Sequence, residues 1–73
     1  MTRRANGHAI RAIREALGIP QHALAARVGV SKSQLSKIEH GASGASPEVL
    51  RKIADELGVT PDAVSHPVAA ASA

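Results

Sequence analysis

The sequence contains no phenylalanine, tyrosine or tryptophan, and no cysteine. A hydrophobic core must therefore be built from isoleucine, leucine, valine and alanine. The aromatic side chains on which single-strand binders and many RNA-binding proteins stack bases are missing, which disfavours those classes of protein. Without cysteine there can be no disulfide, thiolate metal site or cysteine nucleophile, and this composition fits a reducing compartment.

Long hydrophobic runs are missing as well. No apolar run approaches the roughly 20 residues that a membrane-spanning helix requires, and no signal-peptide hydrophobic segment follows Met1. A chain of 73 residues is long enough for one domain with a small core. We therefore expect a single cytoplasmic domain without a membrane partner.

The residue patterns of common enzyme and metal sites do not occur. The histidines lack metal-ligand spacing, and no serine lies in a Gly-x-Ser-x-Gly turn. The segment GASGAS, residues 41–46, lacks the lysine and the preceding strand of a phosphate-binding loop. We expect no enzymatic activity, no cofactor and no metal site. The histidines are interpreted as surface or helix-end residues: His8, His22, His40 and His66.

The positive charge is concentrated in the first half of the chain. Residues 1–40 carry seven lysines and arginines against two acids, a balance of +5, whereas residues 41–73 carry two against four, a balance of −2. A basic half favours a polyanionic partner. Taken alone, this charge pattern fits uneven surface charge without a partner equally well.

Three similar tetrapeptides divide the sequence into helical segments. ALGI, RVGV and ELGV, at residues 16–19, 27–30 and 56–59, each place a glycine where a helix ends and an aliphatic residue after it. Ser31 with Gln34 forms a capping-box pattern, and Ser46 with Pro47 marks another helix start. We expect helices from residue 6 or 7 to 17, then at 20–28, 31–40 and 46–57. A short fifth helix is expected from about residue 60, and no strand.

Apolar residues recur with the helical period in these segments. The sequence therefore predicts an all-α, compact five-helix bundle whose core combines one stripe from each helix. The predicted stripes are Ile10, Ile13 and Leu17; Leu24, Ala25 and Val28; Leu35 and Ile38; and Val49, Leu50, Ile53, Ala54 and Leu57. We assign residues 7–66 to this domain, residues 1–6 to a flexible basic arm and residues 67–73 to a disordered tail.

Residues 21–40 have the pattern of a helix-turn-helix, in which two short helices join at a steep angle through a glycine-containing turn. Gly29 makes the turn, and small Ala25 permits close approach of the helices. Since Leu35 and Ile38 point inward, the helical period of about 3.6 residues predicts an outward face without a carboxylate. Its residues are Lys32, Ser33, Ser36, Lys37 and His40. Glu39 lies off that face.

Two segments, PQHALAARVGVSKSQLSKIEHG and SPEVLRKIADELGVTPDAV, resemble the Cro and phage-repressor type helix-turn-helix family, also called the XRE family. The resemblance covers roughly residues 8–66 and rests on several features together. These are a glutamine that opens the second helix, the Val-Gly-Val turn, LSKIEHG at the end of the third helix and IADELGV at the end of the fourth. It implies a lambda-repressor-like DNA-binding domain.

The resemblance also implies roles for single residues. The third helix is similar to a recognition helix that enters the major groove. Residues at base-contacting positions are Ser31, Lys32, Ser33 and Lys37; those at backbone-contacting positions are Gln21, Ser36 and His40. Arg14 and Glu39 match an ion pair that links the first and third helices in the family. The two lysines favour guanine.

Two departures from the family pattern bear on these roles. Pro20 replaces the usual capping hydroxyl before the second helix. The GASGAS loop lacks basic residues for phosphate contact, so that the backbone amides from Ser46 onward, or Arg51, have to substitute. Arg3 and Arg4 fit either an arm that touches the backbone or minor groove, or a solvated tail.

The function implied is a Cro-like transcriptional repressor, cytoplasmic and associated with the nucleoid. It would bind double-stranded DNA as a homodimer, with half-sites roughly 34 Å apart, and without a small-molecule ligand. We expect the dimer contact around the fifth helix, through Val59, Val64 and Val68, although these valines fit the core as well, and for Val59 the core is favoured. The alternatives are an antitoxin-like protein and a protein-interaction module with the same fold.

Overall fold

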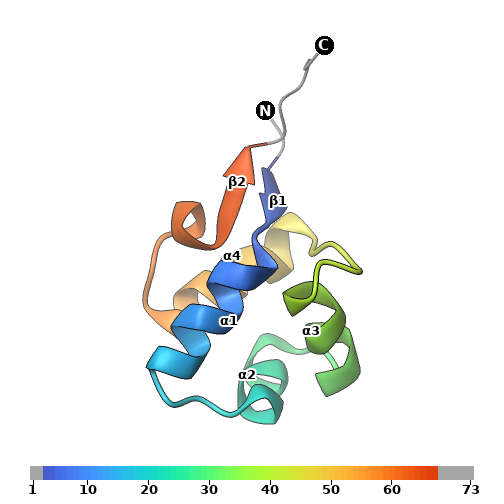
Figure 1. Cartoon of the computed structure of the whole chain (residues 1–73), viewed down its shortest axis with the longest axis vertical. Coiled ribbons are helices and arrows are strands. Elements are labelled where there is room, and N and C mark those ends of the chain that lie inside the picture. The colour runs from blue at the N-terminus through green and yellow to red at the C-terminus, as the bar shows by residue number, and fades with distance from the viewer. Residues whose placement is uncertain (1–2, 68–73) are drawn as a thin grey trace.

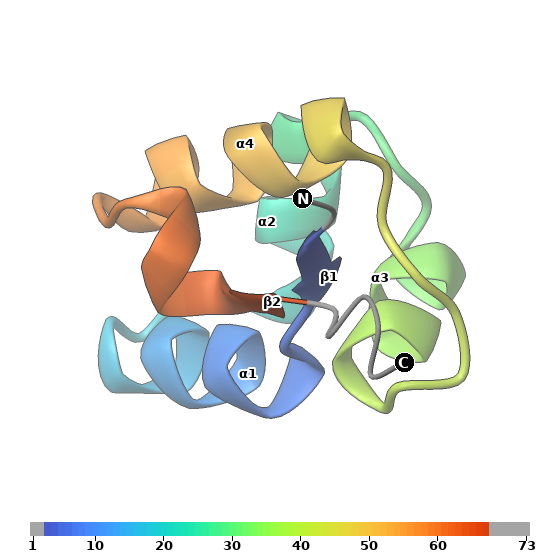
Figure 2. The same ribbon diagram turned by 90° about the horizontal axis from the view of Figure 1, so that it is seen from above.

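The computed structural model describes residues 3–67 (Figure 1). Four α-helices follow in order: α1 (Gly7–Ala16), α2 (Gln21–Val28), α3 (Lys32–Glu39) and α4 (Pro47–Leu57). A 3-10 helix, η1 (Pro61–Val64), follows α4. Two short antiparallel strands, β1 (Arg3–Ala5) and β2 (Ser65–Pro67), bring the two ends of this region together. Seen from above, α1 and α4 lie on either side of this ribbon, and α3 lies beside it (Figure 2).

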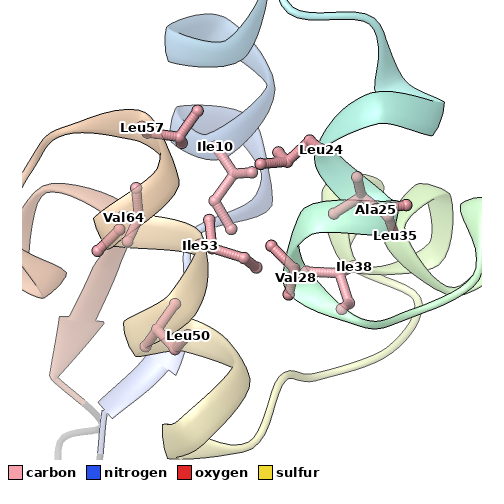
Figure 3. Close-up of a cluster of buried hydrophobic side chains, with 11 residues drawn as sticks. Ile10, Leu24, Ala25, Val28, Leu35, Ile38, Leu50, Ile53, Leu57 and Val64 are labelled. Carbon is pink, nitrogen blue, oxygen red and sulfur yellow. The ribbon is translucent and has the colours of Figure 1, made fainter.

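The core is wholly aliphatic, as the composition requires. Side chains from all four α-helices and η1 meet in one cluster (Figure 3). Its members are Ile10, Leu24, Ala25, Val28, Leu35, Ile38, Leu50, Ile53, Ala54, Leu57 and Val64. Burial of one Leu, Ile or Val side chain contributes about 1.5–3 kcal/mol, so the cluster is the main source of stability in this small domain.

Local sequence signals explain where the helices begin. Oγ of Ser31 accepts a hydrogen bond from the backbone N–H of Gln34 at 3.0 Å, and Oγ of Ser46 accepts one from the backbone N–H of Val49 at 3.2 Å. Pro20 precedes α2 without a side-chain cap, as predicted. The side chain of Gln34 donates to Oγ of Ser43 at 3.1 Å instead of completing the capping box.

The glycines end the helices as predicted. Gly29 adopts the left-handed conformation, with φ of 88°, and the amide of Val30 donates to the carbonyl of Ala25 at 3.0 Å. This is the Schellman motif, in which the chain reverses and the following aliphatic residue packs back on the helix. The same bond joins Ile19 to Arg14 after α1 and Val59 to Ala54 after α4. Ile19, Val30 and Val59 all pack against the core.

The two ends of the described region differ from the expectation. Residues 65–67 pair with Arg3–Ala5, which were expected in a flexible arm, and the amide of Asn6 donates to the carbonyl of Val64 at 2.8 Å. The expected fifth helix is a single 3-10 turn. The expectation that there is no strand is also wrong. Strands of three residues are too short to show the alternation of apolar and polar side chains by which a strand is recognised in a sequence. Residues 1–2 of the arm and 68–73 of the tail, with Val68, lie outside the described residues.

Leu17 was predicted to be buried, and this prediction is wrong. α1 ends at Ala16, and Leu17 is 54% exposed as its C-cap residue. Gly18, with φ of 72°, reverses the chain directly after Leu17, and Ile19 packs on the core in its place.

Gly7 permits the first helix to start directly on the end of the third. A Cβ atom at this position would overlap the carbonyl oxygens of Ile38 and Glu39. The residue type at position 7 therefore sets the distance between α1 and the C-terminal end of α3.

Candidate nucleic-acid interface

Helices α2 and α3 pack as the helix-turn-helix pattern requires. Ala25 is 2% exposed, and its small side chain allows the helices to approach closely. Val28 on α2 and Leu35 on α3 are buried between the helices and the rest of the core. Since one side of α3 is fixed in this way, its opposite side is turned to solvent (Figure 1).

The outward face of α3 has the composition that the sequence predicts. Ser31, Lys32, Ser33, Lys37 and His40 are exposed, and Ser36 is partly buried. The side chain of Glu39, which is the only acid of this helix, is 1% exposed and points away. The structure thus brings the predicted base-contacting residues together on a surface without a carboxylate. Their contacts with DNA stay predictions.

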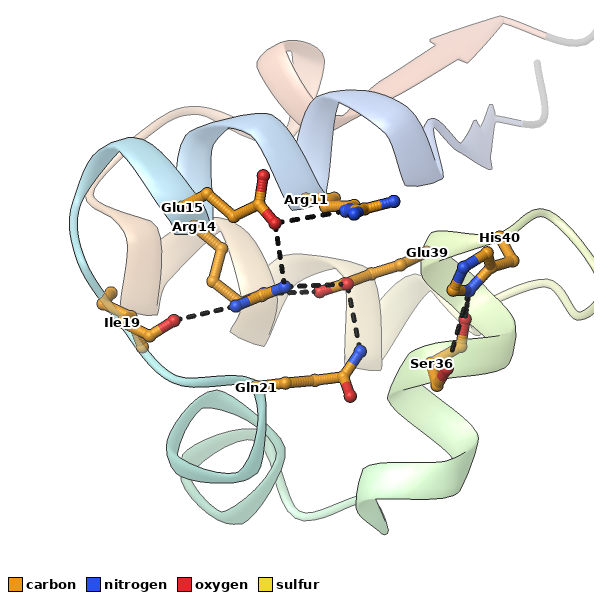
Figure 4. A network of polar contacts seen from close by, with 8 residues as sticks. All are labelled: Arg11, Arg14, Glu15, Ile19, Gln21, Ser36, Glu39 and His40. Atoms are coloured by element: carbon orange, nitrogen blue, oxygen red, sulfur yellow. Dashed lines mark hydrogen bonds and ion pairs between the residues drawn. The ribbon is translucent and has the colours of Figure 1, made fainter.

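A buried network positions this face (Figure 4). Nε of Arg14 donates to one carboxylate oxygen of Glu39 at 2.8 Å, and Nη2 donates to the other at 3.2 Å. Nη1 of Arg14 donates to the carbonyl of Ile19 at 2.9 Å. The side-chain amide of Gln21 donates to Glu39 at 3.1 Å. The expected ion pair is therefore present, and it joins α1, α2 and α3.

The charged state of Arg14 is favoured by this network. The hydrogen bond to Glu39 raises the pKa of Arg14, against the opposing effect of burial. Both carboxylate oxygens of Glu39 have a donor, so neither charge is buried without a partner. Such a pair fixes geometry more than it adds net stability.

Gln21 has a structural role that the sequence did not reveal. We predicted it as a phosphate contact only, whereas its amide nitrogen is bound to a carboxylate 18 residues away. An amide nitrogen carries two protons, so the bond to Glu39 leaves one donor and fixes the direction of the side chain. No local pattern signals this contact, because it depends on how α2 and α3 pack.

The remaining predicted backbone contacts lie beyond α3. Ser46 and Arg51 are exposed, the first as the N-cap of α4 and the second on its surface. His40 is the C-cap residue of α3, and its Nδ1 lies 2.8 Å from the Ser36 carbonyl oxygen.

Residues 3–67 contain no group of acidic and histidine side chains that could hold a metal ion. None of their helices is long and apolar enough to cross a membrane.

A helix-turn-helix with an exposed basic second helix defines a class of DNA-binding proteins. The chain belongs to the helix-turn-helix family of DNA-binding transcriptional regulators, since the family model described as helix-turn-helix matches residues 10–64. No curated protein is significantly similar to the chain in sequence.

Solved structures show the same fold. The P22 c2 repressor, in a complex with a synthetic operator, is 36% identical over 80% of this chain and 88% of its own, with a TM-score of 0.75. The restriction-modification controller protein C.AhdI from Aeromonas hydrophila is 30% identical over 78% and 86%, with a TM-score of 0.75. The biofilm regulator SinR, in complex with DNA, is 33% identical over 77% and 90%, with a TM-score of 0.71.

Proposed function

We propose that the chain is a Cro-like repressor that binds a pseudo-palindromic operator as a homodimer, with α3 in the major groove. The observation that carries this proposal is the exposed outward face of α3, which has no carboxylate and is held by the Arg14–Glu39 pair. The DNA complexes of the P22 c2 repressor and SinR support it.

Base readout is assigned to the N-terminal half of α3 and to Lys37. Lysine donates hydrogen bonds and therefore favours the O6 and N7 acceptors of guanine. Lys32 and Lys37 are both exposed on α3. Ser31 and Ser33 can donate or accept, so they are compatible with several bases. This arrangement favours a half-site that contains guanine.

Phosphate contacts are assigned to side chains around this surface. Gln21 retains one amide proton beside its bond to Glu39, and Ser36 and His40 flank the predicted base-contacting residues on α3. On α4, Ser46 uses its hydroxyl to cap the helix, which leaves backbone amides and Arg51 for contact. These contacts supply most of the affinity, and salt weakens them.

The homodimer is proposed because one helix-turn-helix covers little DNA surface, and two copies give useful affinity on half-sites about 34 Å apart. The predicted contact through Val64 is wrong, since Val64 has no exposed surface and belongs to the core of its own chain. Val59 packs against the same core, as its alternative interpretation stated. Of the three residues predicted for the dimer contact, Val68 lies outside the described residues, so the contact through Val68 stays a prediction.

Selection of bound duplexes from a random DNA pool at near-physiological salt tests the proposal. We expect recovery of a motif with two-fold symmetry and guanine in each half-site. Sedimentation of the complex should then show two chains per site, and one chain per site would contradict the homodimer. Recovery of no motif, with weak salt-sensitive binding only, would contradict operator reading and favour a protein-interaction module.

A further inference from the structure

The ring of His40 is held in one orientation at the end of α3 (Figure 4). Its Nδ1 lies 2.8 Å from the carbonyl oxygen of Ser36, one helical turn earlier, and 3.5 Å from the hydroxyl of the same residue. A carbonyl oxygen only accepts hydrogen bonds, so Nδ1 must carry the proton. In the neutral ring, Nε2 is then an acceptor with a free lone pair.

This outer nitrogen lies on the side of α3 assigned to DNA. Ser33, Lys37 and His40 follow at intervals of four and three residues, which places them on one helical face, and all three are exposed. Nε2 of His40 has no hydrogen-bond partner among residues 3–67. A phosphate oxygen is also an acceptor, and it cannot bond to the lone pair of a neutral ring.

Protonation reverses this relation. An imidazole that gains a second proton donates from both nitrogens. Histidine is the side chain whose ordinary change of charge falls between about pH 5 and pH 8. Nδ1 can then keep its bond to Ser36 while Nε2 donates to phosphate. Rotation of the neutral ring would also present a donor to DNA, but at the loss of the Ser36 bond.

The acids of α3, and of the helices α1 and α2 that make most of its contacts with other elements, already have partners. Of the acids near α3, Glu39 is bound to Arg14 and Gln21, and Glu15 on α1 is paired with Arg11 at 3.2 Å. Residues 41–46 carry no ionisable side chain. The other ionisable groups of α3 and of the helices packed against it are basic: Lys32, Lys37, His8, His22 and Arg27.

We propose that His40 is a proton-dependent phosphate contact, so that operator binding by this chain takes up a proton at the imidazole. The proposal rests on the proposed operator binding. Alkaline conditions then weaken binding through one identified side chain. A charge-assisted hydrogen bond of ordinary strength corresponds to an affinity about tenfold higher, for each chain bound, at about pH 6 than at about pH 8.

The test is the affinity for the selected operator duplex at constant ionic strength across this pH range. We compare the unmodified chain with His40→Gln, whose amide can still donate to phosphate but does not titrate. His66→Gln, on the exposed part of β2, is the matched control. His22→Gln, at the start of α2, tests a second histidine near the interface.

We expect the affinity of His40→Gln to be nearly independent of pH, and His66→Gln and His22→Gln to keep the tenfold change. An unchanged pH dependence in His40→Gln would overturn the proposal while leaving operator binding intact. The absence of duplex binding at every pH would instead refute operator binding itself, and the phosphate contact with it. The free chain gives an independent readout, because nitrogen NMR of the ring should show the proton on Nδ1. A proton on Nε2 would contradict the assignment.

Discussion

Glu39 is the residue on which the geometry of the interface most depends. Its carboxylate is buried at the junction of three helices and receives hydrogen bonds from Arg14 and Gln21. Arg14 has a raised pKa, so the charged form that stabilises the fold is fully present below its ordinary pKa. The contribution of Arg14 is lost only in strongly alkaline solution, where the pH passes the raised pKa.

Replacement of this carboxylate should cost considerable stability. In Glu39→Gln, Arg14 stays buried without its counter-charge, and we expect a loss of about 3 kcal/mol in the free energy of unfolding. Urea denaturation followed by far-UV circular dichroism measures it, since the chain has no tryptophan or tyrosine.

The matched control is Glu15→Gln, which removes the exposed pair with Arg11. Exposed pairs contribute about 0.5 kcal/mol. Equal losses in the two variants would show that burial of the Arg14–Glu39 pair has no consequence for stability.

At the scale of the elements, the turn between α2 and α3 depends on Gly29. Its φ of 88° is costly for a side chain with a Cβ, although the space beside it is open. We expect Gly29→Ala to lower stability by about 1 kcal/mol, which corresponds to a melting temperature lower by about 5 °C.

Gly44→Ala serves as the comparison for this variant. Gly44 also lies in open space, but it is not among the glycines with positive φ. The melting temperature of Gly44→Ala should change little. A similar decrease in both variants would mean that the left-handed conformation at Gly29 does not explain the effect, because the lower flexibility of the unfolded chain raises stability in both.

The elements were predictable from sequence to the extent that their signals are local. Ser31, Ser46 and Gly29 mark helix ends through contacts within a few residues, and all three were assigned correctly. The exposed face of α3 could also be predicted, because the helical period of its buried residues determines which side chains point outward. The bond from Gln21 to Glu39 and the pairing of Arg4 with His66 could not be predicted, because they join residues brought together only by the complete fold.

At the scale of the whole molecule, binding should follow the uneven distribution of charge. The basic half of the chain contains α3, so affinity for any duplex should fall steeply with salt. We expect Arg51→Ala to weaken binding to all sequences alike and to reduce the slope of log K against log salt by about one for each chain in the complex.

Lys52→Ala is the control for the salt experiment, because Lys52 is the next residue on α4, is exposed, and points in another direction. The two variants remove the same formal charge. Equal reductions in the salt slope would show that net charge, and not a contact at Arg51, determines the effect.

The terminal ribbon has a consequence for how this fold can be rebuilt. Arg3 and Pro67 are partners across β1 and β2, so a short linker could join them without disturbing the core. New ends could then be opened in the exposed loop at Gly44, where nothing lies within 4 Å of an added Cβ. In such a circular permutant α4 would come first and α3 last, and α3 could be fused directly to a second domain.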